Sequence, residues 1–128
     1  MNSEHPTLTI RRNDTLDTVQ KLLGLDVPPE GLPESDPPTY YYHLPELGFW
    51  VFFDEKGIVY SIRFDHPYPY VVGAVKIGDT QDDVLRARGN PSRHFPVPDG
   101  KARWIYDKPH FMRVDFEAKT NRVEKIFR

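Results

Sequence analysis

Cysteine is absent from the 128 residues of the chain. Its absence excludes disulfide bonds, thiolate metal sites and lipidated cysteines. No apolar run approaches the roughly 20 residues of a membrane-spanning helix. The first residues, Met1 to Pro6, have neither the basic nor the apolar region of an export signal. We therefore expect a soluble cytoplasmic protein that makes no contact with a membrane.

The sequence also lacks the common signatures of catalysis and cofactor binding. It contains no Gly-x-Ser-x-Gly, no glycine-rich phosphate loop and no His-Glu-x-x-His. Its five histidines are scattered without the spacing of metal ligands. A pairing of His43 with Asp54 or Glu46 has no third group to orient it, so a surface histidine is the simpler interpretation. We expect no enzyme, no catalytic residue, no cofactor and no metal.

Charge is distributed unevenly along the chain. Residues 1–64 carry five Lys/Arg and ten Asp/Glu, a net charge of −5, whereas residues 65–128 carry twelve and nine, a net charge of +3. The acidic half favours a partner with a basic surface. Nucleic acid is the weaker interpretation: Trp104 and Tyr106 could stack on bases, but acidic residues are interleaved among the cations of that half.

Two patterns in the first half of the sequence return in the second half. Asp14-Thr15-x-Asp17-x-Val19 with Gly24 returns as Asp79-Thr80-x-Asp82-x-Val84 with Gly89. Further along, the recurring positions are Tyr42, Pro45, Phe52, Val59 and Ile62, which return as Tyr106, Pro109, Phe116, Val123 and Ile126. The second set recurs at a spacing one residue shorter than the first. A single-residue gap therefore aligns the halves, which indicates a duplicated fold.

Each copy is predicted to contain a helix, a proline-rich loop and three strands. The helices are expected between Thr15 and Gly24 and between Thr80 and Gly89, because threonine caps helix starts and glycine follows helix ends. The predicted loops are Val27–Pro38 and Asn90–Gly100. Leu8-Thr9-Ile10 alternates like a short edge strand. The strand-like runs are Tyr40–His43, Phe49–Asp54, Ile58–Phe64, Arg103–Asp107, Phe111–Glu117 and Arg122–Phe127.

The second copy carries a pattern that resembles a known repeat. It consists of Lys76-Ile77-Gly78-Asp79-Thr80, Val84, Gly89-Asn90-Pro91, Trp104-x-Tyr106, Val114-x-Phe116 and Val123-x-x-Ile126. This pattern resembles the SmpA/OmlA (BamE-like) repeat, and its tandem occurrence is similar in architecture to beta-lactamase inhibitor protein. The resemblance implies an α+β fold, with two tandem helix-plus-three-stranded-meander repeats forming one curved antiparallel sheet with helices on one face. In the tandem relatives the open face binds another protein.

We accordingly expect residues 1–128 to be a single domain built of two repeats. The first repeat is predicted at residues 8–64, a linker at 65–73 and the second repeat at 74–128. Each repeat alone would be marginal in size, so the two are expected to share one sheet.

Comparison of the copies separates the predicted faces of the sheet, because neighbouring strand residues point to opposite sides. In the alignment that matches Tyr42 with Tyr106, apolar residues that match apolar residues are predicted as core: Trp50 with Val114, and Phe52 with Phe116. The intervening apolar residues match charged ones: Phe49 with Arg113, Val51 with Asp115, and Phe53 with Glu117. Phe49, Val51 and Phe53 are therefore predicted to form an exposed patch that binds a partner. The alternative is that the proline-rich loop, the linker aromatics Tyr68 and Tyr70 or a second copy covers this strand.

The recurring aromatic residues of the preceding strand have two interpretations. Tyr40 matches Trp104, and this pair fits either the core or the open face, where it would extend the predicted partner-binding site. Tyr42 matches Tyr106, and the same alternatives apply, with the recurrence favouring a structural position.

The sequence thus predicts a small soluble protein-binding module, an inhibitor or immunity-type protein that occludes its partner through the open face of the sheet. The alternative is a structural subunit or homodimer in which the same apolar patch is a permanent interface.

Overall fold

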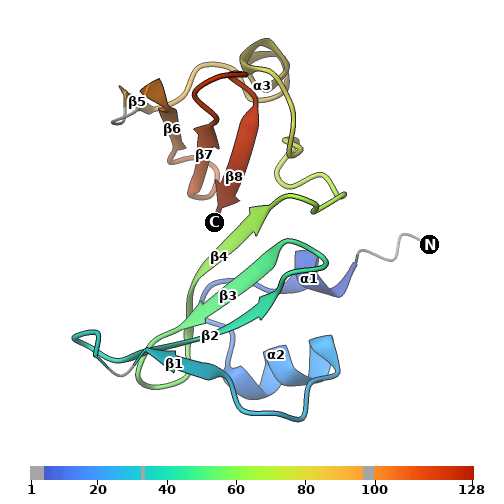
Figure 1. The fold of residues 1–128 in the computed structure, drawn as a ribbon, viewed down its shortest axis with the longest axis vertical. Helices are drawn as coiled ribbons and strands as arrows, with labels where there is room; N and C mark the ends of the chain where they lie inside the picture. The colour runs from blue at the N-terminus through green and yellow to red at the C-terminus, as the bar shows by residue number, and fades with distance from the viewer. Residues whose placement is uncertain (1–4, 33, 97–99) are drawn as a thin grey trace. The chain divides into compact units, whose positions relative to one another are not determined.

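The computed structural model describes residues 5–32, 34–96 and 100–128 (Figure 1). The helices are α1 (Pro6–Thr9), α2 (Leu16–Leu23) and α3 (Gln81–Arg88). The strands are β1 (Glu30–Leu32), β2 (Thr39–Leu44), β3 (Phe49–Phe53), β4 (Val59–Asp65), β5 (Arg93–Pro96), β6 (Ala102–Tyr106), β7 (Met112–Phe116) and β8 (Val123–Phe127). No helix among the described residues is long and apolar enough to cross a membrane.

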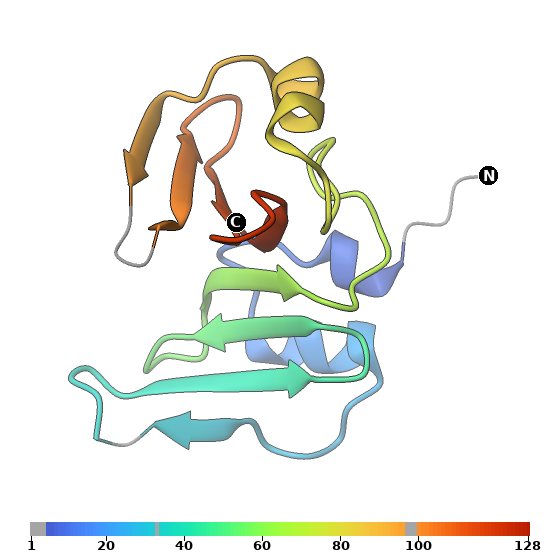
Figure 2. The ribbon, with the colours of Figure 1, turned by 45° about the horizontal axis from the view of Figure 1, so that its top comes forward.

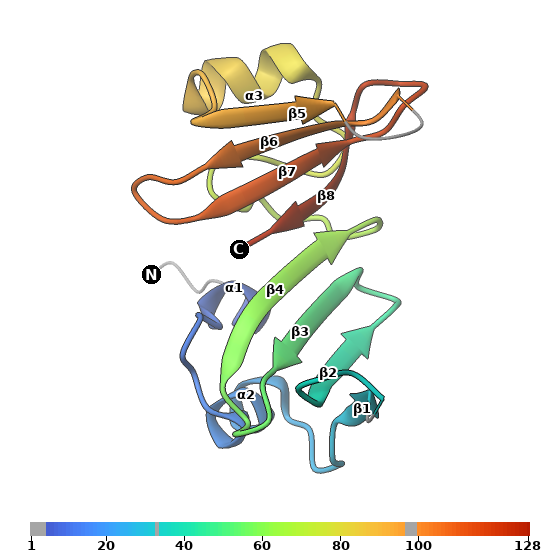
Figure 3. The same cartoon turned by 90° about the vertical axis from the view of Figure 1, so that its left-hand side faces the viewer.

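The strands are hydrogen-bonded in the order β1-β2-β3-β4-β8-β7-β6-β5. The chain divides into two compact units, and the boundary lies within β4. The first unit comprises Met1–Pro45 and Phe49–Ile62, and the second comprises Glu46–Gly48 and Arg63–Arg128. In the first unit α1 and α2 lie on one face of the strands, and in the second unit α3 lies on one face of its strands (Figures 2 and 3).

The predicted fold class, two helix-plus-three-stranded-meander repeats in an α+β arrangement, is wrong. The described residues form mostly an eight-stranded antiparallel sheet with three short helices. The additional strands come from the proline-rich segments, since β1 pairs with β2 and β5 pairs with β6. An edge strand tolerates nearby proline because it hydrogen-bonds on one side only. Residue 33 and residues 97–99, on which parts of the predicted loops fall, lie outside the described residues.

The helix ends predicted from the repeat are confirmed. The Thr15 side chain accepts a hydrogen bond from the Thr18 N–H at 3.2 Å, and Gly24 ends α2 in the left-handed conformation at φ +65°. At the start of α3, Thr80 and Asp83 form a capping box in which each side chain accepts the other residue's backbone N–H. These contacts satisfy backbone donors that have no partner within the helix.

The edge strand expected at Leu8-Thr9-Ile10 is instead the end of α1. His5 precedes this helix, and its ring Nδ1 accepts a hydrogen bond from the Thr7 N–H at 3.3 Å. Pro6 occupies the first turn, where its fixed φ suits a helix and its missing N–H costs no hydrogen bond. Local capping therefore outweighs the alternating pattern.

Tyr42 and Tyr106 are both buried, so the structural interpretation of this recurring pair is confirmed. The Tyr42 hydroxyl donates to the carbonyl of Val27 and accepts from Gln20 Nε2 of α2 at 3.0 Å. The Tyr106 hydroxyl donates to the carbonyl of Gly89, just past α3, at 2.9 Å. In each unit a tyrosine, on β2 or on β6, thus forms a hydrogen bond with the backbone just after the helix, α2 or α3.

β3 alternates in the opposite sense from the prediction. Phe49, Val51 and Phe53 are fully buried, whereas Trp50 and Phe52 are partly exposed. The predicted exposed patch of Phe49, Val51 and Phe53 is therefore wrong, and so is the predicted burial of Trp50 and Phe52.

The length of one turn explains this error. The Asp54 N–H donates to the Ile58 carbonyl in the first unit, and the Glu117 N–H donates to the Arg122 carbonyl in the second, so the second turn is one residue longer. Phe53, which precedes Asp54, therefore corresponds to Phe116, which precedes Glu117. The alignment of β3 with β7 shifts by one residue from the predicted one, and such a shift moves every side chain to the other face.

In this corrected alignment the buried residues of the two strands match. Phe49, Val51 and Phe53 correspond to Met112, Val114 and Phe116, all of them buried. The predicted burial of Val114 and Phe116 is confirmed.

Two phenylalanines of β3 test this register directly. We expect Phe53→Ala to lower the free energy of unfolding by about 3–5 kcal/mol, because it empties a fully buried position. Phe52→Ala, on the other face, should lower it by only about 1 kcal/mol. Urea denaturation followed by circular dichroism measures both, and equal losses would contradict the register.

Gly48 provides a second test of the fold. Its φ is +74°, its carbonyl accepts the Asp65 N–H at 2.8 Å, and a Cβ there would lie 2.1 Å from the Asp65 carbonyl oxygen. We expect Gly48→Ala to lower the free energy of unfolding by about 2–5 kcal/mol, from left-handed strain plus overpacking. Gly24→Ala is the matched control: φ is +65° but no atom lies within 4 Å, so strain alone should cost about 1 kcal/mol. Thermal denaturation of the two variants would refute this account if they proved equally stable.

Candidate functional site

Five aromatic rings gather on the open side of the first unit's strands. They belong to Tyr41, His43, Trp50, Phe52 and Tyr60, which we call the aromatic face. Tyr41 lies directly opposite Phe52, and His43 opposite Trp50, in the pairing of β2 with β3. The helices cover the other side of these strands, and they lie behind β4 in the view of Figure 3.

Each ring of the aromatic face contacts at least one other ring, so the five form a continuous surface. The His43 ring stacks on Trp50, with ring centroids 3.5 Å apart and planes inclined by 13°. Trp50 and Phe52 are parallel within 9° at 5.9 Å, and Tyr41 lies 5.7 Å from Trp50 and 6.2 Å from Phe52. Tyr60 of β4 lies 6.2 Å from Phe52 and is 44% exposed. Each ring restricts its neighbours, which lowers the entropy that the surface would lose on binding.

A carboxylate lies at the edge of the aromatic face. Glu30 of β1 is directly opposite Tyr41, and its Oε2 accepts a hydrogen bond from the Tyr41 hydroxyl at 2.7 Å. This hydrogen bond, with a smaller contribution from burial and from the charge of Glu30, raises the pKa of Tyr41 above its ordinary value. The phenol therefore remains a protonated donor, and it fixes the position of the carboxylate.

The equivalent side of the second unit is charged. In the corrected alignment, Trp50 corresponds to Arg113 and Phe52 corresponds to Asp115. Arg103, Asp115 and Lys125 lie side by side on β6, β7 and β8. Asp115 accepts from Arg103 at 3.1 Å and from Arg113 at 3.0 and 2.7 Å. Since the second unit holds charge at these positions, the fold does not require aromatic residues there.

The other predicted partner-binding residues do not join the aromatic face. Tyr40 lies opposite Phe53 in β2, on the side that holds the core. Trp104 lies opposite Val114, and its ring contacts Phe116 edge-on at 4.6 Å. The prediction that these two residues extend an open-face site with Phe49, Val51 and Phe53 is therefore wrong, because strand alternation turns all five toward the helix side.

The sequence prediction missed Tyr41, Trp50, Phe52 and Tyr60 as surface residues. The structure shows the difference that misled the comparison: the Asp54 N–H donates to the Ile58 carbonyl, whereas the Glu117 N–H donates to the Arg122 carbonyl, one residue further along. Asp54 is no partner of His43: its Oδ1 accepts the backbone N–H groups of Lys56 and Ile58 and closes its own turn.

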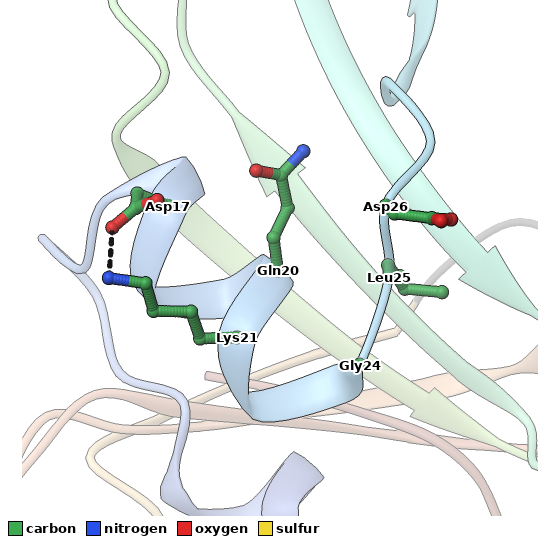
Figure 4. Close-up of a pocket in the computed structure, with 6 residues that line it drawn as sticks. All are labelled: Asp17, Gln20, Lys21, Gly24, Leu25 and Asp26. Carbon is green, nitrogen blue, oxygen red and sulfur yellow. Dashed lines mark ion pairs between the residues drawn. The ribbon is translucent and has the colours of Figure 1, made fainter.

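A shallow depression lies beside α2 (Figure 4). Its lining residues are Asp17, Gln20, Lys21, Gly24, Leu25 and Asp26. Asp17 and Lys21 form a 2.9 Å ion pair, but both side chains are largely exposed, so the pair is weak. The described residues contain no group of three or more His, Asp or Glu side chains that could hold a metal ion.

Comparisons of the chain with protein-family models, with curated proteins and with solved structures found no match. The resemblance to the tandem SmpA/OmlA repeat therefore stays a prediction.

The Asp115 carboxylate makes folding stability depend on pH. Burial raises the pKa of Asp115, but the hydrogen bonds and charges of Arg113 and Arg103 outweigh it and hold the pKa below its ordinary value of 3.8. The folded state therefore binds this proton less tightly than the unfolded state does. Ionised Asp115 stabilises the fold above the ordinary pKa, and this stabilisation is lost as pH falls through the lower folded-state pKa.

We expect Asp115→Asn to be less stable than the wild type at pH 7, because Arg103 and Arg113 lose their shared carboxylate. The difference between the two should narrow as the pH is lowered from about 4 toward 2, following the linkage above. Urea unfolding at a series of pH values measures it. A difference that stays constant with pH would show that the ionised carboxylate is not the stabilising group.

Proposed function

We propose that this protein is a small protein-binding module that docks a partner protein on the aromatic face. By covering the partner's surface it would act as an inhibitor or immunity-type protein, in the cytoplasm. The observation that carries the proposal is a contiguous set of partly or largely exposed rings at positions where the second unit holds charge. Exposed aromatic clusters are typical of interaction sites, since tyrosine and tryptophan bury much area with few rotatable bonds.

Charge supports a partner with a basic surface. The first unit contains four Lys/Arg and nine Asp/Glu, a net charge of −5. An acidic surface accelerates association with a basic partner, while buried aromatic anchors slow dissociation. A homodimer through the same face is the competing function, and measurement of the oligomeric state separates it from docking of another protein.

The test exchanges an aromatic residue for its counterpart in the second unit. Phe52→Asp places at position 52 the residue type of Asp115, and Tyr60→Ser removes the ring that is 44% exposed. We expect both variants to remain folded, and each to weaken binding of a partner captured by the wild type by about thirtyfold or more, as loss of a hot spot does. Isothermal titration with the purified partner measures this, and Lys119→Ser, in the turn between β7 and β8, is the control.

Folded variants that bind the captured partner as tightly as the wild type would overturn the proposal. Light scattering over a range of concentrations distinguishes the competing function. If the wild type is a dimer that both substitutions dissociate, the aromatic face joins two copies of this chain.

A further inference from the structure

The second unit shows how this chain holds an arginine on an open strand surface. The guanidinium carbon of Arg113 lies 4.2 Å from the centroid of the Phe127 ring. The same guanidinium group donates to both oxygens of Asp115, at 3.0 and 2.7 Å. The arrangement therefore has three parts: an aromatic ring, an arginine above it and a carboxylate that accepts two hydrogen bonds.

The first unit contains the ring and the carboxylate of this arrangement but supplies no arginine to them. β1, β2, β3 and residues 59–62 contain no Lys or Arg. Its four cationic residues, Arg11, Arg12, Lys21 and Lys56, lie outside the strands. Within the described part of this unit, no cation lies over the rings of Tyr41, Phe52 or Tyr60. Glu30 uses Oε2 for Tyr41, and its Oε1 accepts no hydrogen bond from the described residues.

We propose that the aromatic face and Glu30 form a site for an arginine side chain of the partner protein. The guanidinium group stacks on the Tyr41 ring, beside Phe52, and donates to Glu30 Oε1. Glu30 is then the residue that selects a cation, while the rings select a planar group. This inference rests on the proposed function and names the chemistry that the partner must present.

Arginine fits this site better than lysine because its guanidinium is planar and weakly hydrated, and presents several donors in a fixed fork. A ring face attracts a cation through its quadrupole, and a carboxylate strengthens the hydrogen bond that a cation donates. The net charge of −5 on this unit opposes the approach of a phosphate backbone, so nucleic acid is disfavoured.

The experiment titrates the intact protein with three capped peptides that differ only in one side-chain type. The sequence Gly-X-Gly-X-Gly carries arginine, lysine or citrulline at X, the last being a neutral isostere of arginine. Nuclear magnetic resonance follows the ring protons of Tyr41 and Phe52. We expect the arginine peptide to change the chemical shifts of these protons and to bind about tenfold more tightly than the citrulline peptide. The affinity of the lysine peptide should lie between the two.

Two matched substitutions test whether the carboxylate of Glu30 is the charge that binds the arginine peptide. Glu30→Gln keeps an acceptor for the Tyr41 hydroxyl but removes the carboxylate. It should lower the affinity for the arginine peptide by about threefold to tenfold. Asp26→Asn removes one charge from the same unit at the depression beside α2 (Figure 4) and should leave the affinity unchanged. Equal binding of the arginine and citrulline peptides, or equal effects of the two substitutions, would overturn the inference.

The outcomes also separate this inference from the proposed function. If no peptide shifts the ring-proton resonances while Phe52→Asp and Tyr60→Ser still weaken binding of the partner, the partner docks without an arginine and only the inference fails. If capture is insensitive to those variants as well, both fail.

Discussion

The alternation of β3 is the constraint on which the first unit depends. All five residues from Phe49 to Phe53 are apolar, so either face of this strand could have formed the core. The helix side takes Phe49, Val51 and Phe53 and buries them completely, and strand geometry then turns Trp50 and Phe52 outward. The strand is apolar on both sides, but α1 and α2 cover one side only. The open rings are thus a direct consequence of the register, and they leave an apolar surface that costs free energy in water unless a partner covers it.

The open side of the second unit differs from that of the first in its side chains. The middle strand of the second unit also buries alternate apolar residues, Met112, Val114 and Phe116, but it places Arg113 and Asp115 on the other side. Those charges are not simply solvated, since Asp115 is only 7% exposed and binds two guanidinium groups. Its open side is thus satisfied by the chain's own ion pairs. The second unit therefore has an open side whose charges pair with one another, whereas the first unit has an aromatic open side with a carboxylate at its edge.

Local signals in the sequence predicted the parts of this fold that local physics determines. Thr15, Thr80 and Gly24 act through contacts within one turn of a helix, and the recurrence of Tyr42 as Tyr106 marked a buried hydroxyl with a fixed partner. The edge strands β1 and β5 could not be predicted in this way, because proline-rich segments form strands only when a neighbouring strand accepts them. The prediction of which side of β3 is buried failed for a different reason. The apolar run from Phe49 to Phe53 carries no polar residue to mark the outer side, and one extra residue between Glu117 and Arg122 shifted the comparison by one position.

That error changed which residues form the candidate site but left intact the reasoning that the two copies differ on their open side. In the corrected alignment the contrast becomes Trp50 against Arg113 and Phe52 against Asp115. Glu30 enters the site only through the pairing of β1 with β2, which the sequence analysis did not predict. Aromatic rings alone would accept many apolar partners, whereas a carboxylate fixed by the Tyr41 hydroxyl penalises every partner that brings no donor to it. In the proposed site, the edge strand β1 would therefore supply the selectivity, and β2 and β3 would supply most of the area.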